Sequence, residues 1–279
     1  MNTANKLSIH AHPSFIEQSA RKRTEQILDT GSMRELLSPF AKVSSPWLEK
    51  QGVIPQFDDG VIVARGTIQG NSAVVAAIEG AFQGGSLGEV GGAKIATVLE
   101  QAIAENKKGN PTTAILILET GGVRLQEANL GLASIAEIQS AIVELRSYAP
   151  VIAIVTGPVG CFGGMSITAG LCSHILITQE GRLGLNGPLV IEQEAGIEEY
   201  NSKDRPFIWS LTGGNQRFNS GFADAFLPDN PTSIREAVIN CTNSSSQDRC
   251  NMFEMYLDKL SKVDTSHQID AETVRTVLS

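Results

Sequence analysis

The sequence predicts an α/β protein in which buried strands alternate with amphipathic helices. Two apolar runs, TTAILILE at 112–119 and PVIAIVTG at 150–157, lack the alternation of a half-exposed strand, which is typical of strands covered on both faces. Apolar residues recur at helical spacing between these runs. Each run ends in a glycine-rich turn, so the middle of the chain twice reads as strand, glycine turn and helix. This order indicates repeated units packed around one sheet.

Composition fits a globular chain and excludes several classes of partner. Of the 279 residues, 42% are hydrophobic and 19% are charged, which is ordinary for a globular protein with a sizeable core. The net charge of −8 argues against a nucleic-acid partner. No run approaches the ~20 apolar residues of a membrane span, and MNTANKLSIHAH lacks the apolar core of a signal peptide. Neither CxxC pairs nor histidines at zinc spacing accompany the cysteines, so we expect a cytoplasmic chain with reduced thiols and no bound metal.

The first 57 residues are expected to form a helical and irregular extension. One helix is predicted from about Ser14 to Asp29, and it carries Arg21-Lys22-Arg23. We interpret this basic cluster as a solvated helix face, with phosphate binding as the alternative. His10 and His12 are expected to be exposed to solvent.

From Gly60 onward the pattern predicts the strands and helices of the core. GVIVARGTIQ and NSAVVAAIE, at 60–69 and 71–79, indicate a hairpin that turns at Gly70-Asn71. A glycine-rich stretch at 82–94 then leads into a helix that ends near Lys107-Lys108. The remaining elements are strands at 112–119, 150–157 and 174–178, helices at 95–108, 132–146 and 165–173, and outer helices at 233–240 and 251–262. We expect a single domain over 1–279, with its core at about 33–230, the extension at 1–57 and peripheral helices at 231–279.

The motif GGSLG at 84–88 raises the possibility of a serine nucleophile. It matches G-x-S-x-G with Ser86 as the attacking residue, between an expected strand and an expected helix. A catalytic triad would still need a histidine, and His174 and His267 are the histidines that follow it. We favour a close-packed glycine turn, in which Gly85 allows close approach of the backbone. The same stretch lacks the GK[ST] ending of a phosphate loop.

Two glycine pairs point more directly to chemistry. Gly121-Gly122 and Gly163-Gly164 each follow a buried strand and precede a helix. Amides at such a junction are expected to be unpaired and to lie at the positive end of the helix. Such donors can stabilise an oxyanion, and glycine allows a ligand to approach the backbone closely.

Four motifs in this order resemble those of the acyl-CoA carboxyltransferases. The motifs are FQGGSLGEVGGAKI, ETGGVRLQE, GPVGCFGG and LNGPLVIEQ, and the resemblance runs from about Met33 to Pro228. Within this superfamily, ETGGVRLQEANLG and VTGPVGCFGGMSITAGLC look most like the beta-subunit family of biotin-independent malonate decarboxylases. The resemblance implies a crotonase-like (ClpP/crotonase-type) fold of ββα units.

The resemblance also implies a reaction and its partners. A malonyl thioester would lose CO2 and become an acetyl thioester while it is bound to an acyl carrier subunit. That carrier holds a CoA-like group, phosphoribosyl-dephospho-CoA, so this chain itself would bind no cofactor and biotin is not expected. A carboxyltransferase-like gamma subunit would complete the active site, and an alpha subunit would transfer the acyl carrier.

The family motifs assign roles to several residues. Gly121, Gly122, Gly163 and Gly164 would donate amides to the oxygens of the substrate. Arg124, Gln126 and Glu127 match the family's arginine and glutamine-glutamate positions, where we favour an internal ion pair that braces the loop. Gly85 and Ser86 are further candidates for supporting the loop or binding substrate, and Cys161 is expected to be a small packing residue.

Three alternatives remain open at the level of the sequence. A protein of the same fold could transfer the carboxyl group of the malonyl thioester to biotin. The chain could be a non-catalytic scaffold for an active partner. Ser86 could act as the nucleophile of a serine hydrolase.

Overall fold

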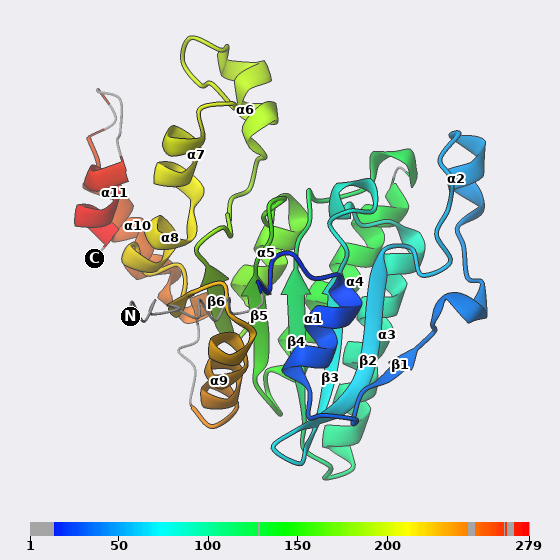
Figure 1. The fold of residues 1–279 in the computed structure, drawn as a ribbon. Helices are drawn as coiled ribbons and strands as arrows, with labels where there is room; N and C mark the ends of the chain where they lie inside the picture. Colours follow the sequence, from blue (N-terminus) through cyan, green and yellow to red (C-terminus); the bar gives the residue numbers. More distant parts are fainter. Residues whose placement is uncertain (1–13, 128, 245–248, 265, 267–270, 279) are drawn as a thin grey trace, which may run out of the picture.

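The computed structural model describes residues 14–127, 129–244, 249–264, 266 and 271–278. A seven-stranded sheet in sequential order, β1 to β7, runs through the centre of this part of the chain (Figure 1). The pairs β1–β2 and β2–β3 are antiparallel, and all later pairs are parallel. The strands are β1 (Arg34–Leu36), β2 (Val61–Ile68), β3 (Asn71–Ile78), β4 (Thr112–Leu118), β5 (Val151–Val155), β6 (His174–Thr178) and β7 (Ala225–Leu227).

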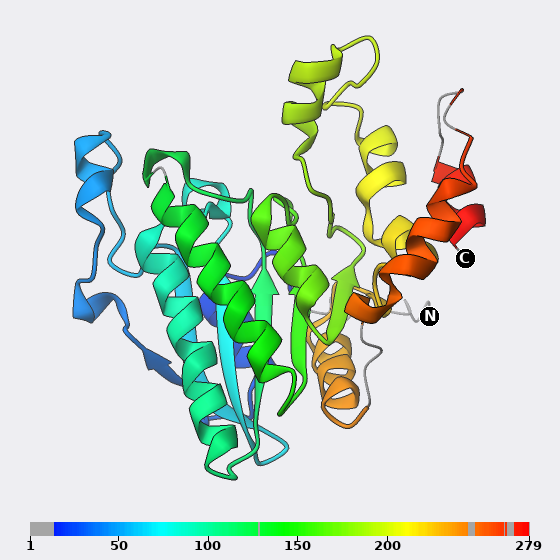
Figure 2. The same cartoon turned by 180° about the vertical axis from the view of Figure 1, so that it is seen from behind.

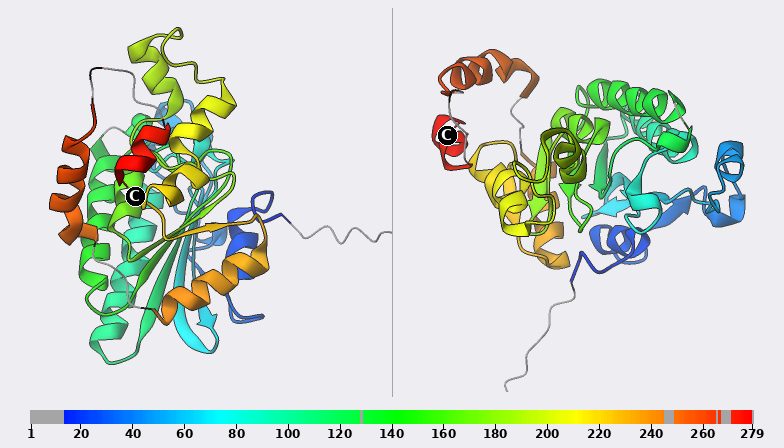
Figure 3. Two further views of the ribbon diagram at one scale, coloured as in Figure 1. Left: turned by 90° about the vertical axis from the view of Figure 1, so that its left-hand side faces the viewer. Right: turned by 90° about the horizontal axis from the view of Figure 1, so that it is seen from above.

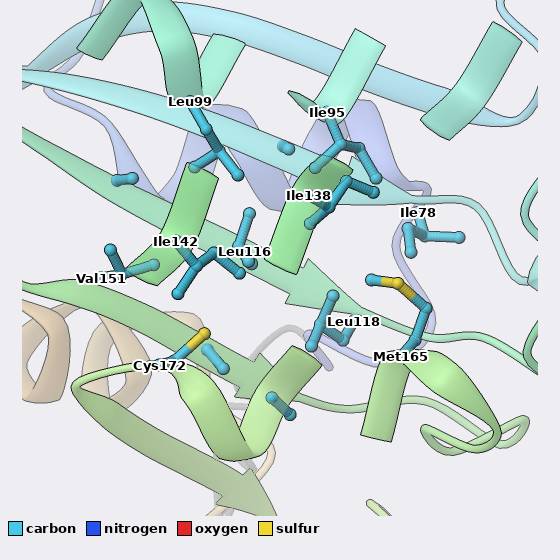
Figure 4. Packing of buried hydrophobic residues seen from close by; sticks show 14 of the residues in the cluster. Ile78, Ile95, Leu99, Leu116, Leu118, Ile138, Ile142, Val151, Met165 and Cys172 are labelled. Carbon is cyan, nitrogen blue, oxygen red and sulfur yellow. The ribbon is translucent and has the colours of Figure 1, made fainter. Parts of the chain in front are cut away.

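Helices cover both faces of the sheet, as the continuous apolar strands predict. Helices α3 (Glu89–Lys107), α4 (Asn129–Leu145) and α5 (Gly164–Leu171) pack on one face, and α1 (Ala20–Ile27) and α9 (Pro231–Thr242) pack on the other (Figures 1 and 2). Alternate residues of each central strand enter the two cores. Leu116 and Leu118 of β4 face the α3–α4–α5 layer, where they pack near Ile138 and Ile142 (Figure 4), whereas Ile117 faces α1 and α9.

Shorter elements surround this three-layered body. Helix α11 contacts α8, and both α10 and α11 lie outside the two helical layers (Figure 3). No helix in the described ranges is both long enough and apolar enough to cross a membrane. These shorter helices are α2 (Pro46–Lys50), α6 (Pro188–Ala195), α7 (Arg205–Thr212), α8 (Gly214–Asn219), α10 (Phe253–Ser261) and α11 (Ala271–Leu278).

The glycine-rich stretch before α3 is partly helical, which corrects the expected helix start at residue 95. Helix α3 begins at Glu89 and includes Gly91 and Gly92. A Cβ atom on Gly92 would lie 2.0 Å from the Oγ of Ser134, so this glycine lets α3 approach α4 closely. Gly91 and Gly92 thus belong to a packed helix and not to a loop. The spacing of apolar residues does not detect helical turns that contain such glycines.

The N-terminal extension differs most from its prediction. Helix α1 is shorter than expected because Ser19 caps it and the preceding residues form turns. A strand, β1, lies within the part expected to be helical and irregular. Arg23 is buried and pairs with Glu119, so the interpretation of the basic cluster as a solvated face is wrong for this residue. His10 and His12 lie outside the described residues.

The parallel part of the sheet determines where a site can form. Strands β3, β4, β5 and β6 point the same way, so the turns that follow them gather at one edge of the sheet. Ligands of open parallel sheets bind outside this carboxyl edge. Both glycine pairs lie in turns at this edge.

Candidate active site

The two glycine pairs follow adjacent strands and touch each other. Gly121-Gly122 follows β4, and Gly163-Gly164 follows β5 and begins α5. A Cβ atom on Gly122 would lie 3.3 Å from the Cα of Gly163, and one on Gly163 would lie 3.1 Å from the Cα of Gly122. Gly122 has a φ of +112° and Gly163 a φ of +62°, values that L side chains rarely adopt. Glycine is therefore needed at both positions for the two loops to meet.

Most amides of the two pairs already have partners inside the protein. The expectation that these amides are unpaired is wrong for three of the four, because neighbouring loops supply acceptors. The three bonds run from the amide of Gly121 to the carbonyl of Gly84 at 3.0 Å, from Gly122 to the Oγ1 of Thr120 at 3.0 Å, and from Gly163 to the carbonyl of Leu185 at 2.7 Å.

The amides of Val123 and Gly164 differ from these three because they lack acceptors among the described residues and lie beside the contact between the two loops. Within the described part of the chain, neither amide has a hydrogen-bond acceptor. A Cβ atom on Gly163 would lie 3.9 Å from the Val123 nitrogen, so this amide borders the contact between the loops. Gly164 is the first residue of α5, where an amide has no acceptor within the helix and experiences the positive end of the helix dipole. The touching loops thus present one free donor each.

The sequence singled out Gly164 but missed Val123. Val123 has a side chain, so a search for exposed glycine amides passes over it. Its amide is free because the bridge between Leu87 and Val123 uses the flanking groups: the Leu87 amide donates to the Gly122 carbonyl, and the Arg124 amide donates to the Leu87 carbonyl. This pairing of the two loops leaves the Val123 amide, between the two bonded groups, without an acceptor in the described structure.

A third loop, which follows β3, packs against the Gly121-Gly122 turn. The 3₁₀ turn η2 (Gln83–Gly85) packs against the end of β4, where a Cβ atom on Gly85 would lie 2.0 Å from the carbonyl oxygen of Glu119. The Gly84 carbonyl takes the Gly121 amide. Gly85 therefore supports the loop through close packing.

Arg124 is a buried link between this loop and its neighbours. Its Nη1 lies 2.6 Å from Asp59 Oδ1 and 3.6 Å from Glu127 Oε1, and both carboxylates are buried. Its Nη2 donates to the Ser86 carbonyl at 2.7 Å and its Nε to the Ser86 Oγ at 3.3 Å. Burial raises the pKa of Asp59, and the Arg124 guanidinium acts in the opposite direction. The internal ion pair expected here is present.

Glu127 and Gln126 differ in their surroundings. Glu127 Oε2 accepts the amide of Glu89 at 2.6 Å, so its carboxylate lies at the N-terminus of α3, where negative charge is favourable. A Cβ atom on Gly88 would lie 1.7 Å from the same oxygen, so Gly88 leaves room for it. Gln126 is exposed at the carboxyl edge and takes no part in this cluster.

Ser86 lacks the geometry of a hydrolase nucleophile. It has a φ of −64° and a ψ of 140°, whereas a nucleophile elbow is a strained strand-to-helix turn. Its Oγ accepts from Arg124. His174 begins β6 and thus lies at the opposite edge of the sheet, and His267 lies outside the described residues. The described residues therefore place no histidine beside Ser86 that could activate it.

Cys161 lies in the loop that carries Gly163-Gly164, and its side chain packs in the core. It is fully buried, and burial raises the pKa of its thiol above the usual range. A thiol in such surroundings does not ionise at neutral pH, so it is a poor nucleophile. This agrees with the packing role expected from the sequence.

The arrangement suits one kind of chemistry. Unpaired amides on two loops that touch are donors of the kind that stabilise an oxygen atom as it becomes negatively charged. The nearby carboxylates of Asp59 and Glu127 are already engaged with Arg124. The site therefore resembles an oxyanion hole and not a nucleophile–base pair.

Comparison with known proteins places these features in context. A model of the carboxyl transferase domain matches residues 17–269. A malonyl-S-ACP:biotin-protein carboxyltransferase of Malonomonas rubra is 39% identical over 235 residues, which is 81% of this chain and 74% of the relative.

Solved structures are similar over most of the chain. A subunit of a Pseudomonas malonate decarboxylase hetero-tetramer, solved in complex with malonate, shares 63% identity at a TM-score of 0.94, covering 96% of this chain and 98% of that chain. A chain of the Pseudomonas malonate decarboxylase MdcD-MdcE hetero-dimer shares 55% identity at a TM-score of 0.76, covering 89% and 97%. The predicted α/β fold of the crotonase-like type is confirmed by these matches.

Proposed function

Since this chain belongs to the carboxyl transferase domain family, we propose that it is the malonate decarboxylase subunit that binds a malonyl thioester and stabilises the enolate left when CO2 departs. The observation that carries the proposal is the pair of free amides, Val123 and Gly164, on two loops that touch. The resemblance seen in the four sequence motifs agrees with this family.

The reaction needs little beyond these donors. When the bond between the carboxylate carbon and C2 of the malonyl group breaks, its electron pair moves toward the thioester carbonyl and forms an enolate. CO2 leaves, and a proton added to C2 gives the acetyl thioester. The amides of Val123 and Gly164 donate hydrogen bonds to the carbonyl oxygen as its negative charge grows. Fixed donors of this kind each contribute about 3 kcal/mol of transition-state stabilisation.

The other glycines shape the site and do not donate. Gly122 and Gly163 allow the loops to meet, which sets the spacing of the two donors. Arg124, with Asp59 and Glu127, fixes the path of the chain directly after Val123. Ser86 and Gly85 join the third loop to the turn after β4: the Ser86 carbonyl accepts from Arg124, and Gly85 packs against the Glu119 carbonyl. Gln126 is exposed at the same edge and is free to contact substrate or a partner.

The thioester is expected to arrive on an acyl carrier subunit. The Malonomonas relative is named for malonyl-S-ACP, and this name supports a carrier-bound substrate here. The carrier would bring its own CoA-like group, phosphoribosyl-dephospho-CoA. An alpha subunit would transfer the acyl carrier. In this scheme the chain supplies backbone donors and no cofactor of its own.

A second, carboxyltransferase-like subunit would cover the carboxyl edge. Two apolar segments flank the glycine loops and project beyond the sheet (Figure 1): residues 37–57, which include α2, and residues 185–197, which include α6. Phe40 is 93% exposed and Ile54 is 86% exposed in the first segment, and Leu185 is 61% exposed in the second. Exposed apolar side chains at this density mark interaction surfaces. The MdcD-MdcE hetero-dimer of the Pseudomonas malonate decarboxylase supports such a partner.

Charge at the first segment should separate the subunits. We expect Phe40→Asp to reduce co-purification with the gamma subunit at least about tenfold, because a carboxylate would lose its hydration at the interface. The measurement is size-exclusion chromatography of the co-expressed subunits. Val143→Asp is the control, since Val143 is also exposed but lies near the far end of α4. Equal behaviour of the two variants would contradict this interface.

The alternative acceptor of the carboxyl group is biotin. The Malonomonas relative is named as a carboxyltransferase to a biotin protein, and the first step of such a transfer would form the same enolate. Release of CO2 from malonyl carrier by the assembled subunits decides between the two. We expect the rate to be unchanged by excess avidin. Loss of CO2 release with avidin, and its return with added biotinyl protein, would favour transfer to biotin.

A further inference from the structure

Glu119 occupies a central place behind the two glycine loops. It follows β4 directly and precedes the Thr120-Gly121-Gly122 turn. Only 4% of its side chain is exposed, and its Oε2 lies 2.6 Å from Nη1 of Arg23, whose side chain is 2% exposed. A charge pair this deeply buried forms close to the reacting edge, yet neither residue belongs to the oxyanion donors.

The carboxylate of Glu119 contacts the loops on both sides of it. Its Oε1 accepts the amide of Val159, in the turn that follows β5, at 3.3 Å. A Cβ atom on Gly157 would lie 2.1 Å from its carboxylate carbon, and one on Gly80 would lie 2.5 Å from the same atom. The turns after β3 and β5 thus both carry a glycine where the Glu119 carboxylate packs. One side chain therefore links three turns at the carboxyl edge.

The β5 turn is held from its other side by Arg182. The Nη2 of Arg182 donates to the carbonyls of Pro158 and Val159, the latter at 3.1 Å. Glu119 takes the amide of Val159, so opposite charges hold the two sides of one peptide segment. This segment continues through Gly160 to the Gly163-Gly164 pair. Its position determines where the Gly164 amide lies relative to the β4 turn.

Arg23 is fixed by the segment that precedes α1. Its Nε donates to the Phe15 carbonyl at 2.9 Å, and its Nη2 donates to the Ile16 carbonyl. The amides of Phe15 and Ile16 in turn donate to Asp229 Oδ1 at 2.8 and 2.9 Å. A continuous chain of polar contacts therefore runs from the loop before α9, through Arg23, to Glu119.

We infer that Glu119 and Arg23 are positioning residues for the decarboxylation proposed above. The buried pair sets the separation of the β4 and β5 turns and thereby the geometry of the Val123 and Gly164 donors. A buried ion pair gives little net stability compared with apolar residues of similar size, so fixing geometry is the effect that the pair adds. The expected effect on kcat rests on the proposed function, whereas the expected effect on the positions of the loops does not.

The test removes the charge without changing the shape. Glu119→Gln keeps an oxygen that can accept the Val159 amide but leaves Arg23 without its counter-charge. We expect kcat of the assembled enzyme on malonyl carrier to fall at least about tenfold while KM stays within about twofold, because misplaced donors weaken transition-state binding more than ground-state binding. The unpaired Arg23 charge should also lower the melting temperature of Glu119→Gln. The double variant Arg23→Met/Glu119→Gln removes that charge, so we expect its melting temperature to return to that of the unmodified chain. We expect its kcat to remain low.

Amide hydrogen exchange gives a readout that does not depend on activity. Exchange at residues 119–124 and 157–164 should be faster in the double variant than in the unmodified chain. Arg235→Met is the matched control, because Arg235 also ties α1 to α9, through Asp29 and the Ile27 carbonyl, without touching the glycine loops. It should lower the melting temperature and leave both kcat and loop exchange unchanged.

Two outcomes would overturn the inference. One is recovery of kcat together with the melting temperature in the double variant, which would make the pair purely structural. The other is unchanged exchange in both loops. If the unmodified enzyme released no CO2, the proposed function would fail, while the exchange comparison would still decide whether Glu119 positions the loops.

Discussion

Replacement of Gly164 by proline is expected to lower kcat on malonyl carrier by about 10²–10³-fold, the usual effect of losing one oxyanion donor. Gly164 is the first residue of α5, a position where proline fits the helix because no intrahelical bond is lost. The substitution therefore removes the amide donor and leaves the helix able to form. Its ring also occupies the space in front of the former amide. The measurement is the steady-state rate of CO2 release by the assembled subunits.

Gly164→Ala is the matched control for this variant. Both substitutions add a Cβ atom, which would lie 3.1 Å from Cγ2 of Ile135, so both require the same small adjustment of that side chain. Alanine keeps the amide, and we expect it to retain kcat within about tenfold of the unmodified enzyme. Equal losses in the two variants would mean that packing against Ile135 matters and the amide does not.

Replacement of Gly122 by valine is expected to reduce turnover at least about tenfold. The Gly122 amide is bonded to Thr120, so the loss does not come from a missing donor. It comes from the added Cβ atom, which would lie 3.3 Å from the Cα of Gly163, and from a φ of +112° that valine does not adopt. The two loops would separate, and the free amides of Val123 and Gly164 would lose the spacing that the proposed oxyanion role requires.

Gly109→Val separates this effect from general strain. Gly109 also has a positive φ, +83°, but nothing lies within 4 Å of a Cβ atom built there. It precedes β4 and so lies at the edge of the sheet opposite to the site. We expect Gly109→Val to lower the melting temperature with kcat nearly unchanged. A loss of kcat in Gly109→Val that matches the loss in Gly122→Val would contradict a local role for Gly122.

These variants also address the possibility that the chain is a scaffold. A scaffold without chemistry would tolerate loss of the Gly164 amide, provided that assembly with the gamma subunit is unchanged. Assembly should therefore be measured for each variant before its rate is compared. Activity of the gamma subunit alone would also favour a scaffold.

The middle strands of the sheet were predictable because they are continuous apolar runs. A strand with both faces buried, such as β4 or β5, needs apolar residues at every position and therefore stands out in the sequence. The glycine pairs were predictable for a related reason, since they interrupt the chain directly after such runs. Short elements were missed, among them β7 and α6, because three to eight residues carry too little periodicity.

The partners of the amides were not predictable from local sequence. The acceptors for Gly121 and Gly163 are the carbonyls of Gly84 and Leu185, which come from other loops. Val123 becomes a donor through the bridge to Leu87, again a tertiary contact. Arg23 is buried because a carboxylate 96 positions later in the chain, Glu119, lies beside it. Local charge patterns favour an exposed face for such a residue, and only the fold reverses that expectation.

The contact between the donors and the thioester oxygen can be observed directly. The measurement is the ¹³C resonance of the carbonyl carbon of [1-¹³C]acetyl-CoA bound to the assembled enzyme. Hydrogen bonds from Val123 and Gly164 polarise the carbonyl, so we expect a downfield shift on binding that persists in Gly164→Ala and shrinks in Gly164→Pro. A bound resonance at the position of the free thioester in the unmodified enzyme would contradict it.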